Sequence, residues 1–251
     1  VIAACAGHQW ATPKALWLAL AGDETMRSRL LLEWRLPRVV TACLVGALLG
    51  LSGAIFQGVF RNPLAEPYLL GASGGPVRWL LPALAFLGAW GSTLLVLAIA
   101  RIAAALDAAG MLLAGVAIAA VLGAVRSFLM LALSDETVSL QVVMSWVLGG
   151  IQTPTWQGVL GLAGLSAACL VLAQRTARGL DLLGLGPGMA QAFGLDVEHF
   201  LPRAILVAAI VVAVAVACGG LVAFVGLAAP HIARWWVGSL HRHVLPASAL
   251  I

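Results

Sequence analysis

Long apolar runs separated by short polar clusters dominate this chain. The first long run extends from Val39 to Phe60 and is interrupted only by three polar residues and four glycines. About 20 mostly apolar residues are enough for a helix to cross the hydrocarbon core of a bilayer. Arg38 precedes the run and Arg61 follows it, and charges at both ends are typical of a membrane-spanning helix. Because glycines let a neighbouring helix approach closely, this helix is expected to lie inside a bundle.

The same pattern predicts further spans along the chain. They cover residues 80–100, 111–133, 156–173 and 204–227. Residues 142–150 are apolar but about half the required length, so they are interpreted as a partial or interfacial helix. Pro230 and His231 are expected to close the last long run, and residues 241–243 are expected to form a turn. A further helix is expected to begin at Val244.

The composition excludes a water-soluble globule. Hydrophobic residues make up 62% of the chain and charged residues 10%, with a mean hydropathy of +1.05, whereas soluble domains carry about 25% charged residues. Transmembrane β-strands would alternate apolar and polar residues, but these runs are continuous. The sequence therefore predicts an all-α polytopic membrane protein surrounded by lipid. The net charge of +4 belongs to the loops and forms no basic face, so no nucleic acid partner is expected.

No motif for a metal or a cofactor stands out. The four cysteines lack metal-ligand or disulfide spacing and are interpreted as small buried hydrophobic residues. His231, His241 and His243 are interpreted as structural, because no acidic or cysteine partners are expected nearby. We expect no catalytic residue, no metal ligand and no cofactor.

A transporter that concentrates its substrate needs a source of energy, and this chain offers none of its own. All ten acidic residues fall in predicted loops or at span ends, whereas ion-driven carriers place ionisable groups within the membrane. Only Arg126 lies inside a predicted span, where it is interpreted first as a structural arginine and second as a pathway residue. The only lysine, Lys14, has no phosphate-binding glycine-rich loop around it. Any energy must therefore arrive through another subunit.

Residues 184–196 are the best candidate contact for that subunit. Gly186 and Pro187 can open a helix of about two turns, and Gly194 can end it in the left-handed conformation. Met189 and Phe193 are four residues apart and therefore share one face of this helix. Such an apolar knob fits a groove on a partner protein, and on pattern alone it fits nearly as well against lipid.

The chain also contains a faint internal echo. Leu36-Pro37-Arg38 recurs as Leu201-Pro202-Arg203, and each opens an apolar run that later reaches a patch of small residues and then a proline. Transporters are often built from duplicated halves, so we interpret the echo as an internal repeat and not as coincidence.

Several ordered blocks carry a resemblance to a known family. They are RLPR at 35–38, SGAIFQGVFRNPLAEPYLLGASGG at 52–75 with the motif residues Asn62, Pro63, Glu66 and Pro67, MLLAGVAIAAVLGA at 111–124, SWVLGG at 145–150, the loop at 184–194, and GLVAFVGLAAPHIAR at 220–234 with Pro230 and His231. Over nearly its whole length the chain resembles the permease subunit of type II ABC importers for ferric siderophores, haem and cobalamin.

The resemblance implies the transmembrane bundle of a type II ABC importer, with more spans in the full family than this chain has. It implies a permease homodimer in the bacterial inner membrane, joined by two copies of an ABC ATPase subunit and by a periplasmic substrate-binding protein. Import would proceed by alternating access along a path lined by residues 111–133, and ATP hydrolysis would occur in the partner. The substrate would be an iron chelate (siderophore or haem) or cobalamin, and nothing in the sequence selects among them.

Two groups of site residues follow from the resemblance. The ATPase contact would comprise Leu185, Gly186, Pro187, Met189, Ala190, Gln191, Phe193 and Gly194. The binding protein would dock on Arg35 and Arg38, here called the arginine collar. Counting spans, with the helix expected to be missing near Gly75 and Pro76 restored, places the arginine collar on the membrane face opposite residues 184–196, where basic residues are unusual.

Three other functions are weighed against this interpretation. A secondary active carrier of a small solute is the alternative, although intramembrane carboxylates are lacking. An intramembrane enzyme would need convergent catalytic groups inside spans, and none is found. A scaffold that does not transport also stays open.

Residues 1–251 are expected to form a single permease domain that is truncated at both ends, since the chain begins at Val1 without methionine and stops at Ile251 inside an apolar run. Residues 68–75 are too short to cross, although relatives have a complete helix there. Because the loss of one crossing would invert every later loop, residues are expected to be missing near Gly75 and Pro76.

Overall fold

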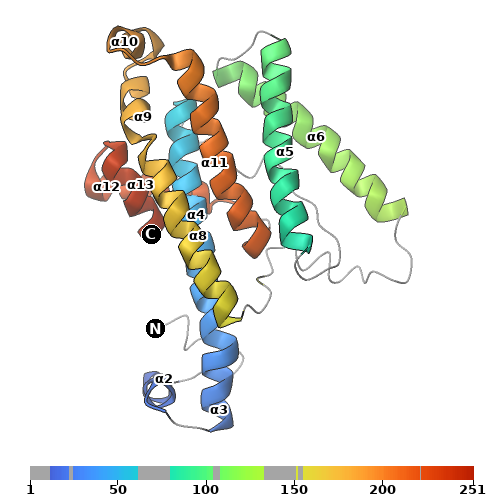
Figure 1. Cartoon of the computed structure of the whole chain (residues 1–251), viewed down its shortest axis with the longest axis vertical. Helices are drawn as coiled ribbons and strands as arrows, with labels where there is room; N and C mark the ends of the chain where they lie inside the picture. Colours follow the sequence, from blue (N-terminus) through green and yellow to red (C-terminus); the bar gives the residue numbers. More distant parts are fainter. Residues whose placement is uncertain are drawn as a thin grey trace.

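The computed structural model describes residues 12–22, 25–61, 80–103, 108–132, 151, 155–220 and 222–251. All regular elements in these ranges are helices, which confirms the predicted all-α class (Figure 1). In chain order they are α2 (Pro13–Leu20), α3 (Met26–Arg29), the π-helix η1 (Leu30–Arg35), α4 (Leu36–Phe60), α5 (Leu80–Ile102), α6 (Ala108–Ala132), α8 (Trp156–Gln174), α9 (Ala177–Gly184), α10 (Pro187–Ala192), α11 (Val197–Gly219), α12 (Val225–Val237) and α13 (His241–Leu250).

Three segments of the described chain are long and apolar enough to cross a membrane. They are η1 with α4, which together cover Leu30–Phe60, then α8 and α11. Helices α5 and α6, with 23 and 25 residues, coincide with two further predicted spans. The apolar runs therefore located α4, α5, α6 and α8 to within a few residues.

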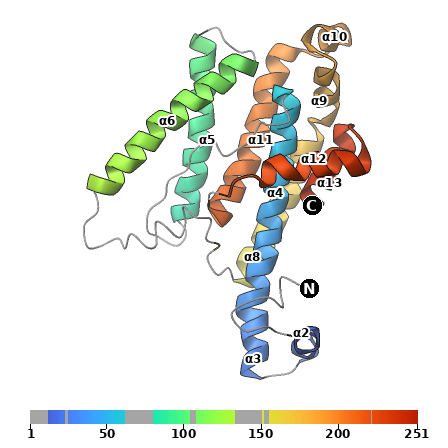
Figure 2. The same ribbon diagram turned by 180° about the vertical axis from the view of Figure 1, so that it is seen from behind.

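Helix α4 is the centre of the bundle, and α8, α11, α12 and α13 pack around it (Figures 1 and 2). Its glycines allow the close packing that the sequence predicted. The backbone carbonyl of Ser248 occupies the space that a Cβ on Gly50 would need, and the carbonyl of Gly226 does the same at Gly53. Gly46 has open space around it, so this glycine does not serve a close contact within the described part of the chain.

The spans around α4 do not simply alternate in direction. In Figure 1, α4 and α8 rise from the end that carries η1 toward α9 and α10, whereas α11 descends. Val45 near the start of α4 accordingly packs on Gly219 at the end of α11. Helix α5 rises in the same direction as α4, so two consecutive described spans are parallel to each other.

The predicted span at 204–227 is wrong in its second half. Helix α11 ends at Gly219, and α12 begins only at Val225. Gly220 and Phe224 both take positive φ angles, 71° and 68°, which an α-helix cannot accommodate. The paired glycines favour this break because glycine lowers helix propensity and adopts such angles without strain.

Two boundary predictions that depended on this run are wrong as well. Pro230 and His231 lie inside α12 and do not close a span. Residues 241–243 form the first turn of α13, where a separate turn was expected. Leu201-Pro202-Arg203 likewise lies inside α11, which begins at Val197 and is capped by Asp196. In the repeated Leu-Pro-Arg motif, the second copy therefore does not mark the start of a helix.

Several predictions lie outside the described residues. These concern the motif residues Asn62, Pro63, Glu66 and Pro67, the partial helix at 142–150, and the residues expected to be missing near Gly75 and Pro76.

Candidate functional site

Three large apolar side chains in and beside the short helix α10 are exposed on the outside of the molecule. Leu185, Met189 and Phe193, spaced four residues apart, are 59%, 52% and 61% exposed. We call these three residues the apolar ridge. Ala190, on the opposite side of the helix, is fully buried and fixes α10 against the rest of the chain. Gln191 is exposed beside the ridge.

The ends of α10 are formed by the residues that the sequence indicated. Gly186 precedes the helix with φ 105°, and Pro187 occupies its first turn. Gly194 takes φ 84° after the last turn, and the Leu195 N–H donates to the Ala190 carbonyl over 2.9 Å. Both glycines adopt angles that disfavour other residues. The predicted start and left-handed end of this helix are confirmed.

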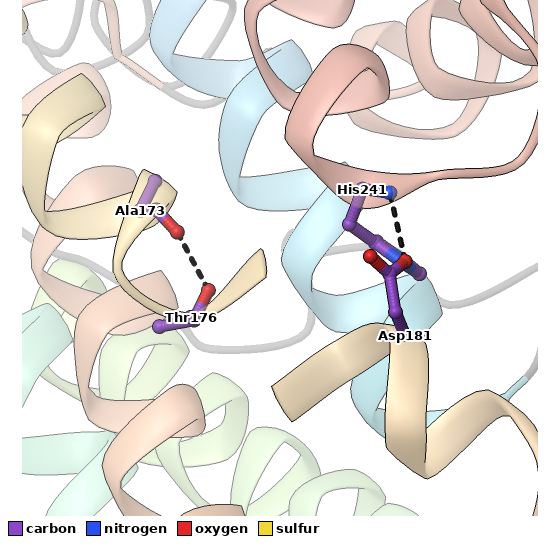
Figure 3. Close-up of polar contacts among 4 residues, drawn as sticks. All are labelled: Ala173, Thr176, Asp181 and His241. Atoms are coloured by element: carbon purple, nitrogen blue, oxygen red, sulfur yellow. Dashed lines mark hydrogen bonds and ion pairs between the residues drawn. The ribbon is translucent and has the colours of Figure 1, made fainter. Parts of the chain in front are cut away.

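Helix α9, which precedes α10, is joined to α13 through one polar pair. Oδ1 of Asp181 in α9 accepts the backbone N–H of His241 over 2.8 Å and the ring Nδ1–H over 2.7 Å (Figure 3). Leu240, the residue before α13, offers no side-chain cap. Asp181 therefore caps α13 from another helix. The prediction that His241 has no acidic partner nearby is wrong. Asp181, 60 residues away in the sequence, lies within hydrogen-bond distance of it.

The imidazole of His241 is enclosed by three helices. A Cβ on Gly58 would lie 2.7 Å from Nε2 of His241 and 3.3 Å from Leu180 of α9, so α4 comes this close only with glycine there. Burial lowers the pKa of His241, against the raising effect of the Asp181 hydrogen bond and charge, and Arg234 lowers it further. The neutral imidazole with its proton on Nδ1 fits these surroundings.

Further contacts fix the junction between α8 and α9. The hydroxyl of Thr176 donates to the Ala173 carbonyl over 2.7 Å at the bend between the two helices (Figure 3). The side-chain amide of Gln174 donates to the carbonyl of Arg242 over 3.2 Å. Gly179 lies against the ring of Phe200, which occupies the space of a Cβ. These contacts order the bend between α8 and α9, join α8 to α13 and pack α9 on α11.

Helix α11, which follows α10, begins with a side-chain cap from Asp196. Oδ1 of Asp196 accepts the backbone N–H of His199 over 3.2 Å, and Oδ2 lies 2.7 Å from the His199 ring. These bonds lower the pKa of the exposed Asp196 carboxyl. The cap gives α11 a defined start directly after α10.

The arginine collar lies at the far end of α4. Arg35 ends η1 and is half-buried, and Arg38 is exposed in the first turn of α4. The indole N–H of Trp156 donates to the carbonyl of Leu32 over 3.0 Å, so α8 also begins at this level. Arg38 and Gly58 are 20 residues apart in α4, so the arginine collar lies about 30 Å from Gly58 and the adjoining α9 at 1.5 Å per residue. The arginine collar and the apolar ridge therefore occupy opposite ends of the bundle (Figure 1).

A polar contact inside the bundle was not predicted. Arg234 Nη1 donates to Gln57 Oε1 over 2.6 Å, and Gln57 Nε2 donates to the carbonyls of Gly226 and Leu227 over 3.3 and 3.2 Å. Gln57 is only 3% exposed. A lone glutamine in an apolar run was the available signal, because a buried amide needs partners.

The remaining motif residues serve packing. Pro230 is fully buried in α12, and His231 is exposed, with its ring 5.2 Å from that of Trp235. Among the described residues, no three histidine, cysteine or acidic side chains come together as a metal site. The described part of the chain is thus a helical membrane bundle with an apolar knob at one end and arginines at the other.

Comparison with known proteins gives the family. Residues 1–251 match the FecCD transport family. The hemin transport system permease protein HmuU of Yersinia pestis is 34% identical over 94% of this chain and 75% of its own length. The vitamin B12 import system permease protein BtuC of Escherichia coli O139:H28 is 35% identical over 270 aligned positions, covering all of this chain and 78% of BtuC.

A solved structure of a metal-chelate type ABC transporter in an inward-facing conformation has the same fold. Its TM-score is 0.83 with 27% identity, over 99% of this chain and 81% of that one. These likenesses define the class as a type II ABC importer permease, a transport subunit that is not itself an enzyme. The chain belongs to the FecCD transport family. Membership implies an ATPase partner and a substrate-binding protein.

Proposed function

We propose that this permease imports an iron chelate (siderophore or haem) or cobalamin by alternating access. Support for the substrate class comes from the hemin permease HmuU and the vitamin B12 permease BtuC. We further propose a homodimer in the bacterial inner membrane, served by two copies of the ATPase and by a periplasmic binding protein.

The ATPase contact is assigned to Leu185, Gly186, Pro187, Met189, Ala190, Gln191, Phe193 and Gly194. The observation that carries this assignment is the apolar ridge, three large apolar side chains more than half exposed, with Met189 in α10 and Leu185 and Phe193 next to its two ends. Such a ridge fits a groove on a partner, where its burial would stabilise the complex. The arginine collar at the opposite end is assigned to the binding protein, because paired arginines suit acidic partners and steer encounter.

Capture of the ATPase tests the assignment. The double variant Met189→Asp with Phe193→Asp should lose co-purification with the cognate ATPase in detergent, because charges in an apolar contact are unfavourable. Met26→Asp in α3 is the matched control, since Met26 is 74% exposed at the other end of the molecule. Equal ATPase capture by the double variant and the control would overturn the assignment.

The comparison also supports a missing crossing. The BtuC alignment has 270 positions although the whole chain has 251 residues, a surplus of about one membrane-spanning helix. Together with the parallel directions of α4 and α5, this supports the proposal that about one helix is absent near Gly75 and Pro76. Insertion of a relative's helix between these two residues should raise the yield of membrane-inserted protein. An unchanged yield would count against it.

A further inference from the structure

The junction of α4, α9 and α13 contains a polar connection that the ABC importer function leaves unexplained. A single oxygen of Asp181 accepts both the backbone N–H and the ring N–H of His241, over 2.8 and 2.7 Å. The two side chains are 26% and 11% exposed. Figure 3 shows the carboxylate of α9 pointing directly at the first residue of α13.

This pair lies immediately next to the apolar ridge in the chain. Asp181 is four residues before Leu185, and the connection from α9 to α10 is closed by two backbone bonds, Leu185 N–H to the Leu182 carbonyl over 3.1 Å and Gly186 N–H to the Leu183 carbonyl over 3.0 Å. Leu180 and Leu183 are buried on the inner face of α9. We therefore expect a displacement of α10 to move α9 as well, because the connection between the two helices is short and hydrogen-bonded.

The imidazole of His241 lies in surroundings that are unfavourable for a polar ring. Its Nε2 is buried and has no hydrogen-bond partner among the described residues. A buried polar atom without a partner is costly, and an apolar side chain would fill the same space without that cost. Gly58 must also stay small to admit the ring. The arrangement gains one thing that an apolar contact would lack, a directed bond that joins α9 to the start of α13.

We propose that Asp181 and His241 are positioning residues that make α9, α10 and α13 move as one body, so that a displacement of the apolar ridge by the ATPase reaches the membrane helices. This proposal rests on the assignment of the apolar ridge to the ATPase. The acceptor oxygen of Asp181 is the essential group, and its charge is secondary. Asp181→Asn keeps an acceptor at this position, whereas Asp181→Ala removes it.

Distance measurements between spin labels test the proposal without any knowledge of the substrate. In protein whose four natural cysteines are replaced by serine, one label is placed at Ala192→Cys on α10, outside the assigned ATPase contact, and one at His243→Cys on α13, both exposed. Distances are compared for the permease–ATPase complex without nucleotide and with ATP trapped by vanadate. A second label pair joins His243→Cys to Trp34→Cys near the arginine collar.

If the proposal holds, the distance from α10 to α13 stays the same in both nucleotide states, while the distance from α13 to Trp34→Cys changes. In Asp181→Ala the first distance should change or broaden on ATP trapping and the second should cease to respond. Asp181→Asn should behave as the unsubstituted protein does. Identical distances in Asp181→Ala and the unsubstituted protein, or no response to ATP in either, would overturn the proposal.

ATPase capture and the distance measurements together separate this proposal from the assignment of the apolar ridge to the ATPase, on which it rests. If the Met189→Asp and Phe193→Asp variant still captures the ATPase, the ridge assignment fails. If that variant loses the ATPase while Asp181→Ala responds to ATP normally, only the connection through His241 fails.

Discussion

The guanidinium of Arg234 donates a 2.6 Å hydrogen bond to the side-chain oxygen of Gln57, and this bond fastens α12 to α4 inside the bundle. Gln57 completes the contact by donating to two carbonyls in the first turn of α12, those of Gly226 and Leu227. One buried side chain thus satisfies polar groups at both ends of α12. The Gly226 carbonyl needs such a donor, because residue 230, four positions further along α12, is proline and has no N–H.

Gln57→Leu should destabilise the protein by about 1–3 kcal/mol, because it leaves the Arg234 guanidinium and two carbonyls without this partner. The measurement is the midpoint of thermal unfolding in detergent. Ser127→Ala is the control, since this hydroxyl is exposed and bonds only the Gly123 carbonyl of its own helix. Equal midpoints for Gln57→Leu and the control would contradict the role given to this contact.

Gly53→Ala should separate α4 from α12, because the new methyl group would meet the carbonyl of Gly226. Overpacking of this kind costs about 1–3 kcal/mol. Gly46→Ala in the same helix has open space and provides a matched control. This control should be neutral or stabilising by about 0.5–1 kcal/mol, since alanine favours a helix more than glycine does. An equal shift of the thermal midpoint in Gly53→Ala and Gly46→Ala would contradict the packing argument.

Acidification should weaken the protein through His241. Burial lowers the pKa of this histidine below the ordinary value of 6.5, so the unfolded chain takes up the proton more readily than the folded one. The stabilising contribution is complete above about pH 6.5 and is lost as the pH falls from there toward the folded pKa.

The measurement is the difference between thermal midpoints at pH 7.5 and pH 5.5. His241→Gln should reduce this difference, while His243→Gln, an exposed neighbour, should leave it as in the unsubstituted protein. A difference of the same size in His241→Gln would show that other groups cause the acid sensitivity.

Arg35→Glu with Arg38→Glu should weaken association with the binding protein by about tenfold or more, since the charge that steers the partner is reversed. Capture of the ATPase should be unaffected, because the apolar ridge lies at the other end of α4. Binding kinetics on immobilised permease measure the first effect. Arg175→Glu with Arg178→Glu, two exposed arginines near α9, should leave binding-protein affinity unchanged. Equal affinity for both double variants would contradict the role of the arginine collar.

The sequence predicted elements whose signals are local. The apolar runs placed α4, α5, α6 and α8, and Gly186, Pro187 and Gly194 placed both ends of α10. These predictions work because span length and turn residues act over a few neighbouring positions.

Contacts between distant segments were out of reach. Asp181 and His241 are 60 residues apart, and each alone resembles an ordinary loop residue. The break at Gly220 was also missed, because hydrophobicity continues across it and outweighed the signal of the paired glycines. The roles of the arginine collar and the apolar ridge stay predictions, since they depend on partner proteins.

The cap on α13 also orders the assembly of the bundle. Helix α13 has no capping side chain of its own, and its first amide is satisfied by an acceptor made 60 residues earlier. During synthesis the carboxylate of Asp181 is thus already present when His241 leaves the ribosome. A nascent chain with a misplaced α9 therefore lacks the acceptor that satisfies the first amide of α13.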